Sequence, residues 1–318
     1  MDYEGQICRA PMERGAFMLP VAVGCSYNAC KFCMLFKHLR FRELPLEQIE
    51  REILRVKNMG GDPERVYLGD GNAFCLDADR LLTILAMVHE HFPSCKSVNM
   101  DATITNIMNK TDDELKALYD AGVRCLYLGI ESGLDDVLEL IAKDHRLDQA
   151  YEQIARIQKF GYAYAAHIMT GVAGKGRGQE NARATAEFLN RTHPCHVVNF
   201  SMMLHTDAPI YKDILAGTYE PADELETLRE EYTLLSLLDT ETEYDALHDG
   251  EFFRVRGKLP QDKERMLKAT AAAVARQEEQ GPVYVWGSTC ACIEHRFEIH
   301  HTRTPFEHFE VEAPHKAV

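Results

Sequence analysis

The sequence predicts an α/β protein in which helices flank a parallel β-sheet. Short apolar segments alternate with amphipathic segments of helical period, about six times over residues 1–240 and at intervals of roughly 30 residues. The apolar segments are continuous rather than alternating, as expected of strands buried on both faces. Such repetition favours right-handed βαβ units, either in a partial or complete barrel or in a doubly wound open sheet.

The expected strands share a run of apolar or β-branched residues bounded by turn residues. They are residues 16–23, 65–69, 96–100, 125–130, 162–169 and 196–204. In both candidate architectures the ligand site lies at the carboxyl ends of the strands.

The expected helices share apolar side chains three and four residues apart, and several have end signals. The stripes are residues 46–56, 82–91, 115–118, 134–141, 150–157, 182–190 and 221–238. Gly60 and Gly61 end the first helix, Asp77 or Asp79 caps the second, and Thr111 with Glu114 forms a capping-box pattern before the third.

The repeating pattern stops near Asp239. We expect irregular structure over residues 241–257, a charged helix over residues 260–279 and a strand over residues 283–286. We therefore expect residues 1–240 to form the strand-and-helix domain, with the cysteine-rich loop 25–33, and residues 241–318 to form a helical or irregular C-terminal cap.

Composition limits the possible partners. The chain has 318 residues, 46% of them hydrophobic, and a formal net charge of −15. Nucleic acid and anionic membranes are not expected partners of so acidic a chain, although a local basic patch would be hidden in the average. No apolar run approaches the roughly 18 residues of a spanning helix, and the N-terminus lacks a signal-peptide pattern.

These features predict a cytoplasmic protein, in which thiols stay reduced. The ten cysteines are then not a disulfide framework. We expect the scattered ones to be small core residues; they are Cys8, Cys75, Cys95, Cys125 and Cys195.

Three other cysteines form the most informative motif. Cys25, Cys30 and Cys33 have C-x4-C-x2-C spacing directly after an apolar run. Soft thiolates at this density suit zinc or an iron–sulfur cluster. Since a 4Fe–4S cluster normally takes four thiolates, three would leave one iron open for a substrate or cofactor. A structural zinc site with His38 as fourth ligand, and three unrelated thiols, are the alternatives.

Polar and glycine residues follow several expected strands. They are Asp70-Gly71-Asn72, Glu131-Ser132-Gly133 and Gly171. Because the carboxyl ends of parallel strands meet at one edge, we expect these residues to converge with the cysteine loop. Taken alone, Asp70 is more typical of a turn, and Glu131 is more typical of a helix N-terminus.

A second cysteine motif lies near the C-terminus. Cys290 and Cys292 are followed by His295 and a histidine-rich tail. Two cysteines cannot hold a second cluster in the usual four-thiolate way. The pair is a candidate metal site, a candidate catalytic thiol that gives a hydrogen atom to a substrate radical, or an ordinary structural pair.

Together these motifs resemble the radical S-adenosylmethionine (SAM) enzyme superfamily. The resemblance is carried by residues 24–33, 69–72, 126–133 and 259–263 and covers roughly residues 15–267. The commonest cysteine spacing there is C-x3-C-x2-C, and this chain has one extra residue between Cys25 and Cys30. It resembles a subfamily with the longer loop, often labelled as similar to oxygen-independent coproporphyrinogen oxidase.

The resemblance implies a partial (β/α)6 TIM-type barrel and a set of cofactor residues. Cys25, Cys30 and Cys33 would bind three irons of a 4Fe–4S cluster, whose fourth iron would chelate SAM. The other implied contacts are Phe32 with adenine, Gly69, Asp70 and Gly71 with the methionyl ammonium, Glu131 and Ser132 with ribose, and Gly171 and the segment from Leu204 to Pro209 with adenine.

The resemblance further implies anaerobic radical chemistry. The cluster would reductively cleave SAM to a 5′-deoxyadenosyl radical, which takes a hydrogen atom from a small-molecule substrate, with flavodoxin or ferredoxin as electron donor. Residues on or near strand ends are expected to line the substrate space: Tyr67, Asn99, Asp101, Tyr127, His167, Asn199 and Met203. The alternatives are an iron–sulfur electron carrier or sensor, and a zinc-dependent hydrolase.

Overall fold

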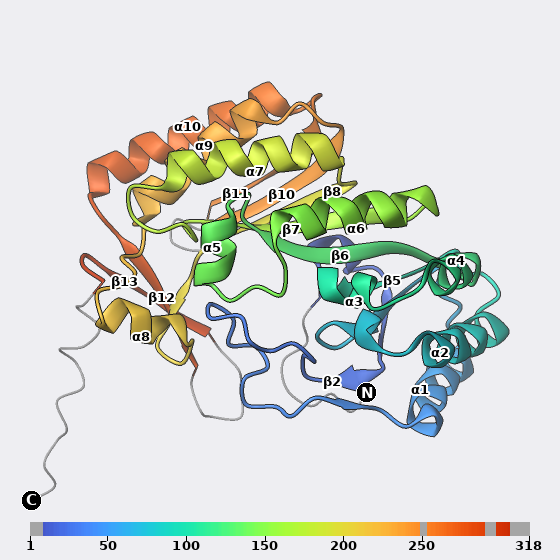
Figure 1. Cartoon of the computed structure of the whole chain (residues 1–318). Coiled ribbons are helices and arrows are strands. Elements are labelled where there is room, and N and C mark those ends of the chain that lie inside the picture. The colour runs from blue at the N-terminus through green and yellow to red at the C-terminus, as the bar shows by residue number, and fades with distance from the viewer. Residues whose placement is uncertain (1–8, 249–252, 290–296, 306–318) are drawn as a thin grey trace, which may run out of the picture. The chain divides into compact units, whose positions relative to one another are not determined.

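The computed structural model describes residues 9–248, 253–289 and 297–305. Its centre is an eight-stranded sheet in the order β1-β4-β5-β6-β7-β8-β10-β11 (Figure 1). The strands are β1 (Phe17–Pro20), β4 (Arg65–Gly69), β5 (Ser97–Ala102), β6 (Val123–Glu131), β7 (Ala163–Thr170), β8 (His196–Ser201), β10 (Thr242–His248) and β11 (Phe253–Leu259). β1, β4, β5 and β6 pair in parallel, whereas β10 and β11 pair antiparallel.

The predicted α/β class is therefore confirmed. The sheet is mostly parallel, and within the described residues β1 and β11 end the strand order, so the sheet is not closed into a barrel. This open arrangement agrees with the partial TIM-type barrel that we expected.

The longer helices are α1 (Leu46–Asn58), α2 (Ala78–His91), α4 (Asp112–Asp120), α6 (Leu147–Lys159), α7 (Gly178–Thr192), α9 (Glu224–Leu237) and α10 (Lys263–Gln280). The shorter ones are α3 (Ile104–Met108), α5 (Asp135–Leu140) and α8 (Ile210–Leu215), with 3-10 turns η1 (Pro11–Glu13) and η2 (Ala73–Cys75). Two small sheets complete the described fold: β2 (Ala22–Val23) with β3 (Arg42–Glu43), and β9 (Leu204–His205) with β12 (Tyr284–Thr289) and β13 (Phe297–Thr302).

The predicted end signals are confirmed only in part. The Thr111 hydroxyl accepts a hydrogen bond from the Glu114 backbone N–H at 3.2 Å, and the Glu114 carboxylate accepts one from the Thr111 backbone N–H at 2.7 Å. Asp77 stands at the N-cap of α2 but makes no capping hydrogen bond with its side chain.

Our expectation of irregular structure over residues 241–257 is wrong. This segment contains β10 and the first part of β11, which extend the central sheet as an antiparallel pair. Along β10, Thr242, Tyr244, Ala246 and His248 are buried while Glu243 is exposed, which is the period of a strand with one covered face. The buried polar residues disguised that period. The C-terminal region thus contains strands as well as a helix, and the boundary at residue 240 stays a prediction.

Two compact units can be distinguished by their internal contacts. Unit 1 comprises Met1–Ile130, Leu138–His167 and Thr192–Val198, and unit 2 comprises Glu131–Val137, Ile168–Arg191 and Asn199–Val318. Each is described by itself below.

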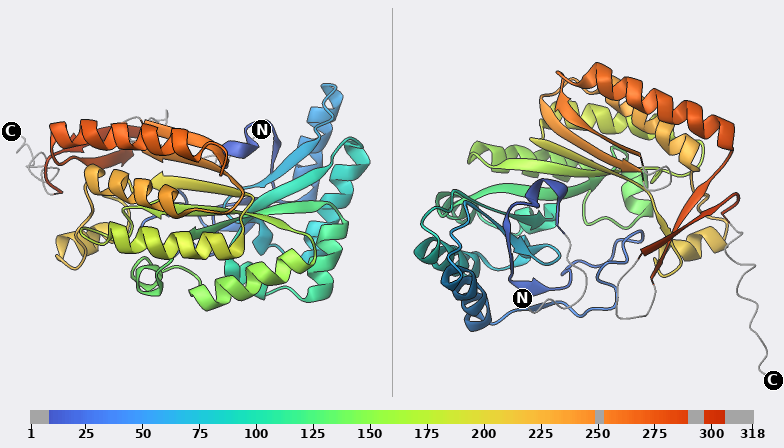
Figure 2. Two further views of the ribbon diagram at one scale, coloured as in Figure 1. Left: turned by 90° about the horizontal axis from the view of Figure 1, so that it is seen from above. Right: turned by 180° about the vertical axis from the view of Figure 1, so that it is seen from behind.

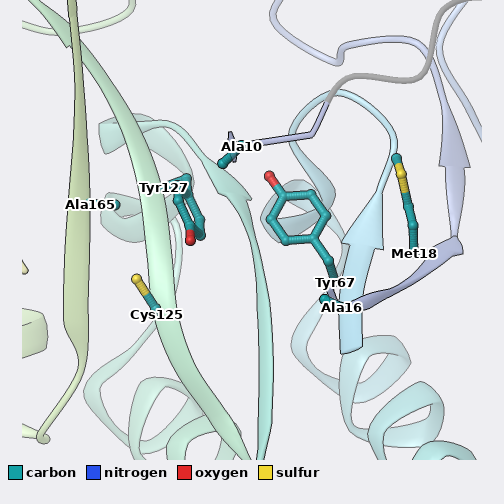
Figure 3. Close-up of a cluster of buried hydrophobic side chains, with 7 residues drawn as sticks. All are labelled: Ala10, Ala16, Met18, Tyr67, Cys125, Tyr127 and Ala165. Atoms are coloured by element: carbon teal, nitrogen blue, oxygen red, sulfur yellow. The ribbon is translucent and has the colours of Figure 1, made fainter. Parts of the chain in front are cut away.

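In unit 1 the two faces of the strands differ. Val66, Leu68 and Val98 are apolar and fully or almost fully buried, and α1 packs against both β1 and α2. On the other face, the rings of Tyr67 and Tyr127 meet edge to face with centroids 5.7 Å apart. Figure 3 shows Ala10 beside these two rings, in a cluster that also contains Met18, Cys125 and Ala165.

In unit 2 two long helices pack together. α9 packs against α10, and α10 packs against β11 (Figures 1 and 2). The buried residues of α10 are Met266, Thr270, Ala273 and Gln277, whose spacing of three and four residues forms one helical face. The buried residues of α9 include Glu224, Glu230 and Glu231. A search for apolar residues at helical spacing would not identify these acidic residues as buried.

Within the described residues, none of the helices combines the length and the hydropathy that a membrane crossing requires.

Candidate functional site

The cysteine loop runs from Gly24 to Phe41 and connects β2 to β3. These two strands pair antiparallel, with Val23 opposite Arg42, and so bring the two ends of the loop together. Cys25, Cys30 and Cys33 are all partly exposed, and none of the described cysteines is in a disulfide. The thiols are therefore held near the surface of unit 1 in a loop that is closed at its base.

The segment after β4 lies directly against the first cysteine. Gly71 has φ +60°, and a Cβ atom at that position would be 2.2 Å from the Gly24 carbonyl oxygen and 2.9 Å from the Cys25 Cα atom. The next residue, Asn72, accepts hydrogen bonds at its Oδ1 atom from both the backbone N–H and the hydroxyl of Ser26, each at 3.1 Å. Only glycine fits at position 71, and the predicted proximity of these two segments is present in unit 1.

The middle of the loop is anchored to the segment that follows α5. The Tyr27 hydroxyl donates to the Ala142 carbonyl at 2.6 Å, and the Lys31 backbone N–H donates to the Ile141 carbonyl at 2.8 Å. Inside the loop, the Asn28 amide donates to the carbonyl of Phe36, whose ring is buried. The loop therefore has a defined conformation that depends on hydrogen bonds to backbone carbonyls.

The chemistry of the three cysteines suits an iron–sulfur cluster. Cys25, Cys30 and Cys33 are partly exposed on one loop, and their thiolates are the soft donors that such a cluster takes. Among the described residues, no group of three or more His, Cys, Asp or Glu side chains is placed to hold one metal ion.

The scattered cysteines divide into two groups. Cys95 and Cys125 are buried, as expected, but Cys75 and Cys195 are only partly buried, and Cys8 lies outside the described residues. Burial and the nearby Cys25 thiol raise the pKa of Cys75, which a hydrogen bond with Ser26 lowers. We missed this neighbour of the cluster loop, although its place three residues after Asn72 is a usable signal.

Acidic groups gather near the end of β4 and on β5. Asp70 is buried, and burial together with the charges of Asp70 and Glu13 raises the pKa of Asp101 to about 7, against a hydrogen bond from Tyr67. A carboxyl group with that pKa exchanges protons near neutral pH.

The acids extend to the first 3-10 turn. Glu13 is buried, and its Oε1 atom accepts hydrogen bonds from the Asn99 amide at 2.6 Å and from the Tyr127 hydroxyl at 2.9 Å. Burial, with a smaller effect of the Lys143 charge, lowers the pKa of His167 to about 4, so this imidazole is neutral at pH 7. Five of the predicted substrate-space residues thus belong to one polar group of side chains in unit 1: Tyr67, Asn99, Asp101, Tyr127 and His167.

In unit 2, the strand end at Glu131 has an unusual backbone. Glu131 is buried and has φ +63°, a conformation that a non-glycine residue adopts only when its surroundings hold it there. Ser132 is fully buried, and its hydroxyl donates to Asn181 Oδ1 at 2.5 Å and accepts from the Leu134 N–H at 3.1 Å. The Ser132 side chain, which follows Glu131, is therefore fixed by hydrogen bonds inside unit 2, and its ribose contact stays a prediction.

The turn at Gly171 is joined to that strand end by side chains of α7 and α9. The Gly171 N–H donates to Glu230 Oε2 at 2.9 Å, and the Asn181 amide donates to Glu230 Oε1 at 2.6 Å. Gly171 has φ +83°, and a Cβ there would be 2.6 Å from Thr227 Cγ2. One buried chain of hydrogen bonds thus links Ser132, Asn181, Glu230 and Gly171.

Glu230 has a perturbed acidity. Burial raises the pKa of its carboxyl group to about 8, although the hydrogen bonds from Gly171 and Asn181 favour the charged form. Nothing in the local sequence marks this residue, because it lies on α9 among residues with no recognisable motif.

A second buried cluster lies nearby in unit 2. His248 Nδ1 is 3.2 Å from Glu224 Oε1, and its Nε2 atom is 3.9 Å from Glu231 Oε2. Burial alone would lower the pKa of His248, but the two carboxylates outweigh it and raise the pKa to about 10. Asn199, expected to line the substrate space, is fully buried; it accepts a hydrogen bond from the Thr170 N–H at 3.1 Å and donates one to Glu231.

The remaining predicted residues have less distinctive surroundings. Leu204 is buried in β9 and lies opposite Trp286 of β12, and Phe32 is partly exposed within the cysteine loop. Cys290, Cys292 and His295 lie outside the described residues.

Comparison with known proteins identifies one family and several distant relatives. The family model described as the Radical SAM superfamily matches residues 19–189. The heme chaperone HemW of Bacillus subtilis is 23% identical over 174 residues, which are 52% of this chain and 46% of that protein. An uncharacterised methyltransferase of Pyrococcus horikoshii is 25% identical over 171 residues, 53% of this chain and 35% of that protein.

Among solved structures, methylornithine synthase aligns with a TM-score of 0.51 and 15% identity over 83% of this chain and 82% of that one. A likeness at this identity shows the fold alone. The chain spans less than half the length of the two curated relatives, so it shares with them one region only.

Proposed function

Since the chain belongs to the Radical SAM superfamily, we propose that it is an enzyme that binds a 4Fe–4S cluster through Cys25, Cys30 and Cys33 and uses SAM as its cofactor. When bound, the cluster and SAM supply a reductive cleavage that yields a 5′-deoxyadenosyl radical, which takes a hydrogen atom from a substrate. The substrate is proposed to be a small molecule and the reductant a flavodoxin or ferredoxin.

The observation that carries this proposal is the packing of residues 69–72 against the cysteine loop. A simple iron–sulfur carrier has no need of a glycine at 71 fitted to the Cys25 backbone, or of Asn72 bound to Ser26. An enzyme that must place a ligand beside its cluster needs such a segment, because reacting groups are useful only when they are held in position.

The roles of the residues follow from this assignment. Gly69, Asp70 and Gly71 are assigned to the methionyl ammonium, since a buried carboxylate stabilises a positive charge. Phe32 is assigned to adenine, Glu131 to ribose, and the backbone at Gly171 and Leu204 to adenine. Asp101 is proposed to exchange a proton near pH 7, because burial raises the pKa of its carboxyl group to about 7.

The test is an anaerobic assay of the reconstituted protein. The full chain is loaded with iron and sulfide, reduced with dithionite in the presence of SAM, and analysed for 5′-deoxyadenosine by chromatography. We expect formation of 5′-deoxyadenosine that depends on both cluster and reductant.

Two outcomes would contradict the proposal. A stable cluster with no cleavage of SAM would indicate an iron–sulfur carrier or sensor. Stoichiometric zinc in anaerobically purified protein, with no cluster after reconstitution, would favour a zinc enzyme.

A further inference from the structure

The sequence around the cysteine loop has an unusual charge distribution. From Arg14 to Arg42 there is no Asp or Glu, although the whole chain contains 50 acidic and 35 basic residues. At the average composition of the chain, a stretch of this length would carry about four or five acidic residues. It carries five basic ones instead: Arg14, Lys31, Lys37, Arg40 and Arg42.

The structure places several basic side chains of this stretch at the surface of unit 1. His38, Arg40 and Arg42 are exposed, and Lys31, which lies between the second and third cysteines, is partly exposed. Lys37 differs, because its ammonium group donates a hydrogen bond to the Asn28 carbonyl inside the loop.

The closure of the loop brings this charge close to the thiols. β3 returns the chain to β2, so that Arg42 is opposite Val23, two residues before Cys25. A Cβ atom on Gly24 would lie 3.5 Å from the Cα atom of Phe41, which separates Arg40 from Arg42. Arg40 and Arg42 therefore flank the backbone that carries the first cysteine.

The exposure of these basic side chains is not explained by a role in stabilising a negatively charged cluster inside the protein. A charge that faces water is screened and contributes little to the stability of a fixed neighbouring group. The same charge still attracts an oppositely charged macromolecule that approaches from solvent to within about one Debye length. Under the function proposed above, the cluster also has to receive its electron from an external donor.

We propose that the basic surface formed by Lys31, His38, Arg40 and Arg42 is the docking site for an acidic one-electron carrier protein. The proposal rests on the function proposed above. One electron passes from the reduced carrier to the cluster held by the three cysteines. The carrier is oxidised and the cluster reduced by one electron, and no bond forms or breaks. Opposite charges on the two surfaces raise the rate of productive encounter.

Nucleic acid is the other macromolecule with the required negative charge. A long polyanion would extend beyond this small surface and meet the remainder of a chain whose net charge is −15. A compact acidic protein can contact the basic surface alone, which favours a carrier protein.

The test compares two reductants on one set of variants. The reconstituted full chain is mixed anaerobically with a reduced acidic flavodoxin, and bleaching of the cluster absorption gives the second-order rate constant. The double variant Arg40→Glu/Arg42→Glu is compared with Lys268→Glu/Arg276→Glu, which makes the same charge change at exposed positions of α10. Dithionite-driven formation of 5′-deoxyadenosine is measured in parallel.

We expect the rate constant with flavodoxin to fall at least about tenfold in Arg40→Glu/Arg42→Glu at low ionic strength, with a weaker salt dependence. The α10 variant should keep the rate constant of the wild type, and dithionite-driven activity should be the same in all three proteins.

An unchanged rate constant in the loop variant would overturn the proposal. So would tight binding of a single-stranded RNA oligonucleotide that only the loop variant loses. If the glutamate variant does not hold a cluster, Arg40→Gln/Arg42→Gln is used, and loss of the cluster there too would show that these residues serve the cluster itself. Failure of the proposed function is distinguished by dithionite, because wild-type protein would then be reduced without cleaving SAM.

Discussion

The cysteine loop of unit 1 and the Glu131 and Gly171 turns of unit 2 are held in place in different ways. The loop keeps its three thiols partly exposed and is anchored by hydrogen bonds to backbone carbonyls, such as those from Tyr27 and Lys31. The two turns are buried, and carboxyl groups and amides inside the protein support them, with Glu230 at the centre.

The difference is consistent with what each region is proposed to do. A loop that receives iron and sulfide, and is later reduced by another protein, has to remain reachable from solvent. Turns that recognise an invariant nucleoside gain from rigidity, since a preorganised site loses less entropy on binding. Glu131, whose positive φ is rare for a residue other than glycine, accordingly lies beside buried polar side chains.

The largest expected effect is loss of the cluster when a cysteine of the loop is replaced. Cys30→Ala should remove the visible absorption of the cluster and reduce formation of 5′-deoxyadenosine to background, because the cluster loses one of its three thiolates. Cys95→Ala is the matched control, since Cys95 is a buried cysteine of the same unit outside the loop. Equal iron content in the two variants, measured after anaerobic reconstitution, would refute the ligand assignment.

The next prediction concerns the fit between residue 71 and the loop. Gly71→Ala should cost most of the bound iron, because its Cβ would be 2.2 Å from the Gly24 carbonyl oxygen and displace Cys25. Gly60→Ala imposes a similar backbone conformation, with φ +83° and nothing within 4 Å of the added atom, and should cost only about 1–2 kcal/mol of stability.

Iron analysis and thermal unfolding of both variants test this fit. If Gly71→Ala binds as much iron as Gly60→Ala, the segment after β4 does not shape the cluster loop.

The sequence was sufficient for the regular parts of this account. Continuous apolar runs marked β4, β6 and β7, and the spacing of three cysteines with a glycine-rich turn marked the superfamily that the family model also identifies. Those features are local, so each can be recognised within ten or so residues.

The features that the sequence did not reveal depend on contacts between residues that are far apart along the chain. Three buried carboxyl groups of α9 have partners that are distant in the sequence. Glu230 accepts a hydrogen bond from Asn181, Glu231 accepts one from Asn199, and Glu224 lies beside His248. The same buried polar residues hid the strand at β10, because His248 breaks the apolar alternation that a strand with one covered face should show. Cys75 was expected to be a core thiol because its contact with Ser26 and Cys25 is tertiary, although its place three residues after Asn72 is a local signal.

A smaller effect is expected from the support of the nucleoside turns. Glu230→Ala should weaken SAM binding about tenfold with the cluster intact, because the Gly171 N–H and the Asn181 amide both lose their acceptor. Glu230→Gln should recover most of the affinity, since its amide oxygen can still accept from Gly171. Titration calorimetry with SAM and with 5′-methylthioadenosine measures the affinity of each variant for the two ligands.

Glu13→Gln serves as control for that experiment, because Glu13 is an equally buried acceptor in unit 1. A loss confined to SAM, with 5′-methylthioadenosine bound normally, would contradict the assignment of Gly171 to the nucleoside.

The last prediction concerns stability and not cofactor binding: a pH dependence that originates in unit 2. Its source is the pKa of His248, which the carboxylates of Glu224 and Glu231 raise from 6.5 to about 10 against the effect of burial. Between these values the folded chain holds a proton that the unfolded chain has released. Stability is therefore fully present below pH 6.5 and is lost as pH rises toward 10, by up to about 1.4 kcal/mol per pH unit.

The buried carboxyl group of Glu230 adds a loss of the same sign as pH rises toward 8, because burial raises its pKa. His248→Gln should flatten the part of the curve above pH 8, as measured by thermal unfolding under anaerobic conditions. An identical curve in this variant would mean that His248 is not charged in the folded protein.

The central claim is that three cysteines leave one iron of the cluster available to SAM. Electron paramagnetic resonance of the dithionite-reduced protein, recorded with and without SAM, tests it most directly. The account predicts that SAM changes the spectrum of the reduced cluster and that Cys95→Ala behaves identically. A spectrum unaffected by saturating SAM, in protein with a full complement of iron, would show that no iron of the cluster is open to the cofactor.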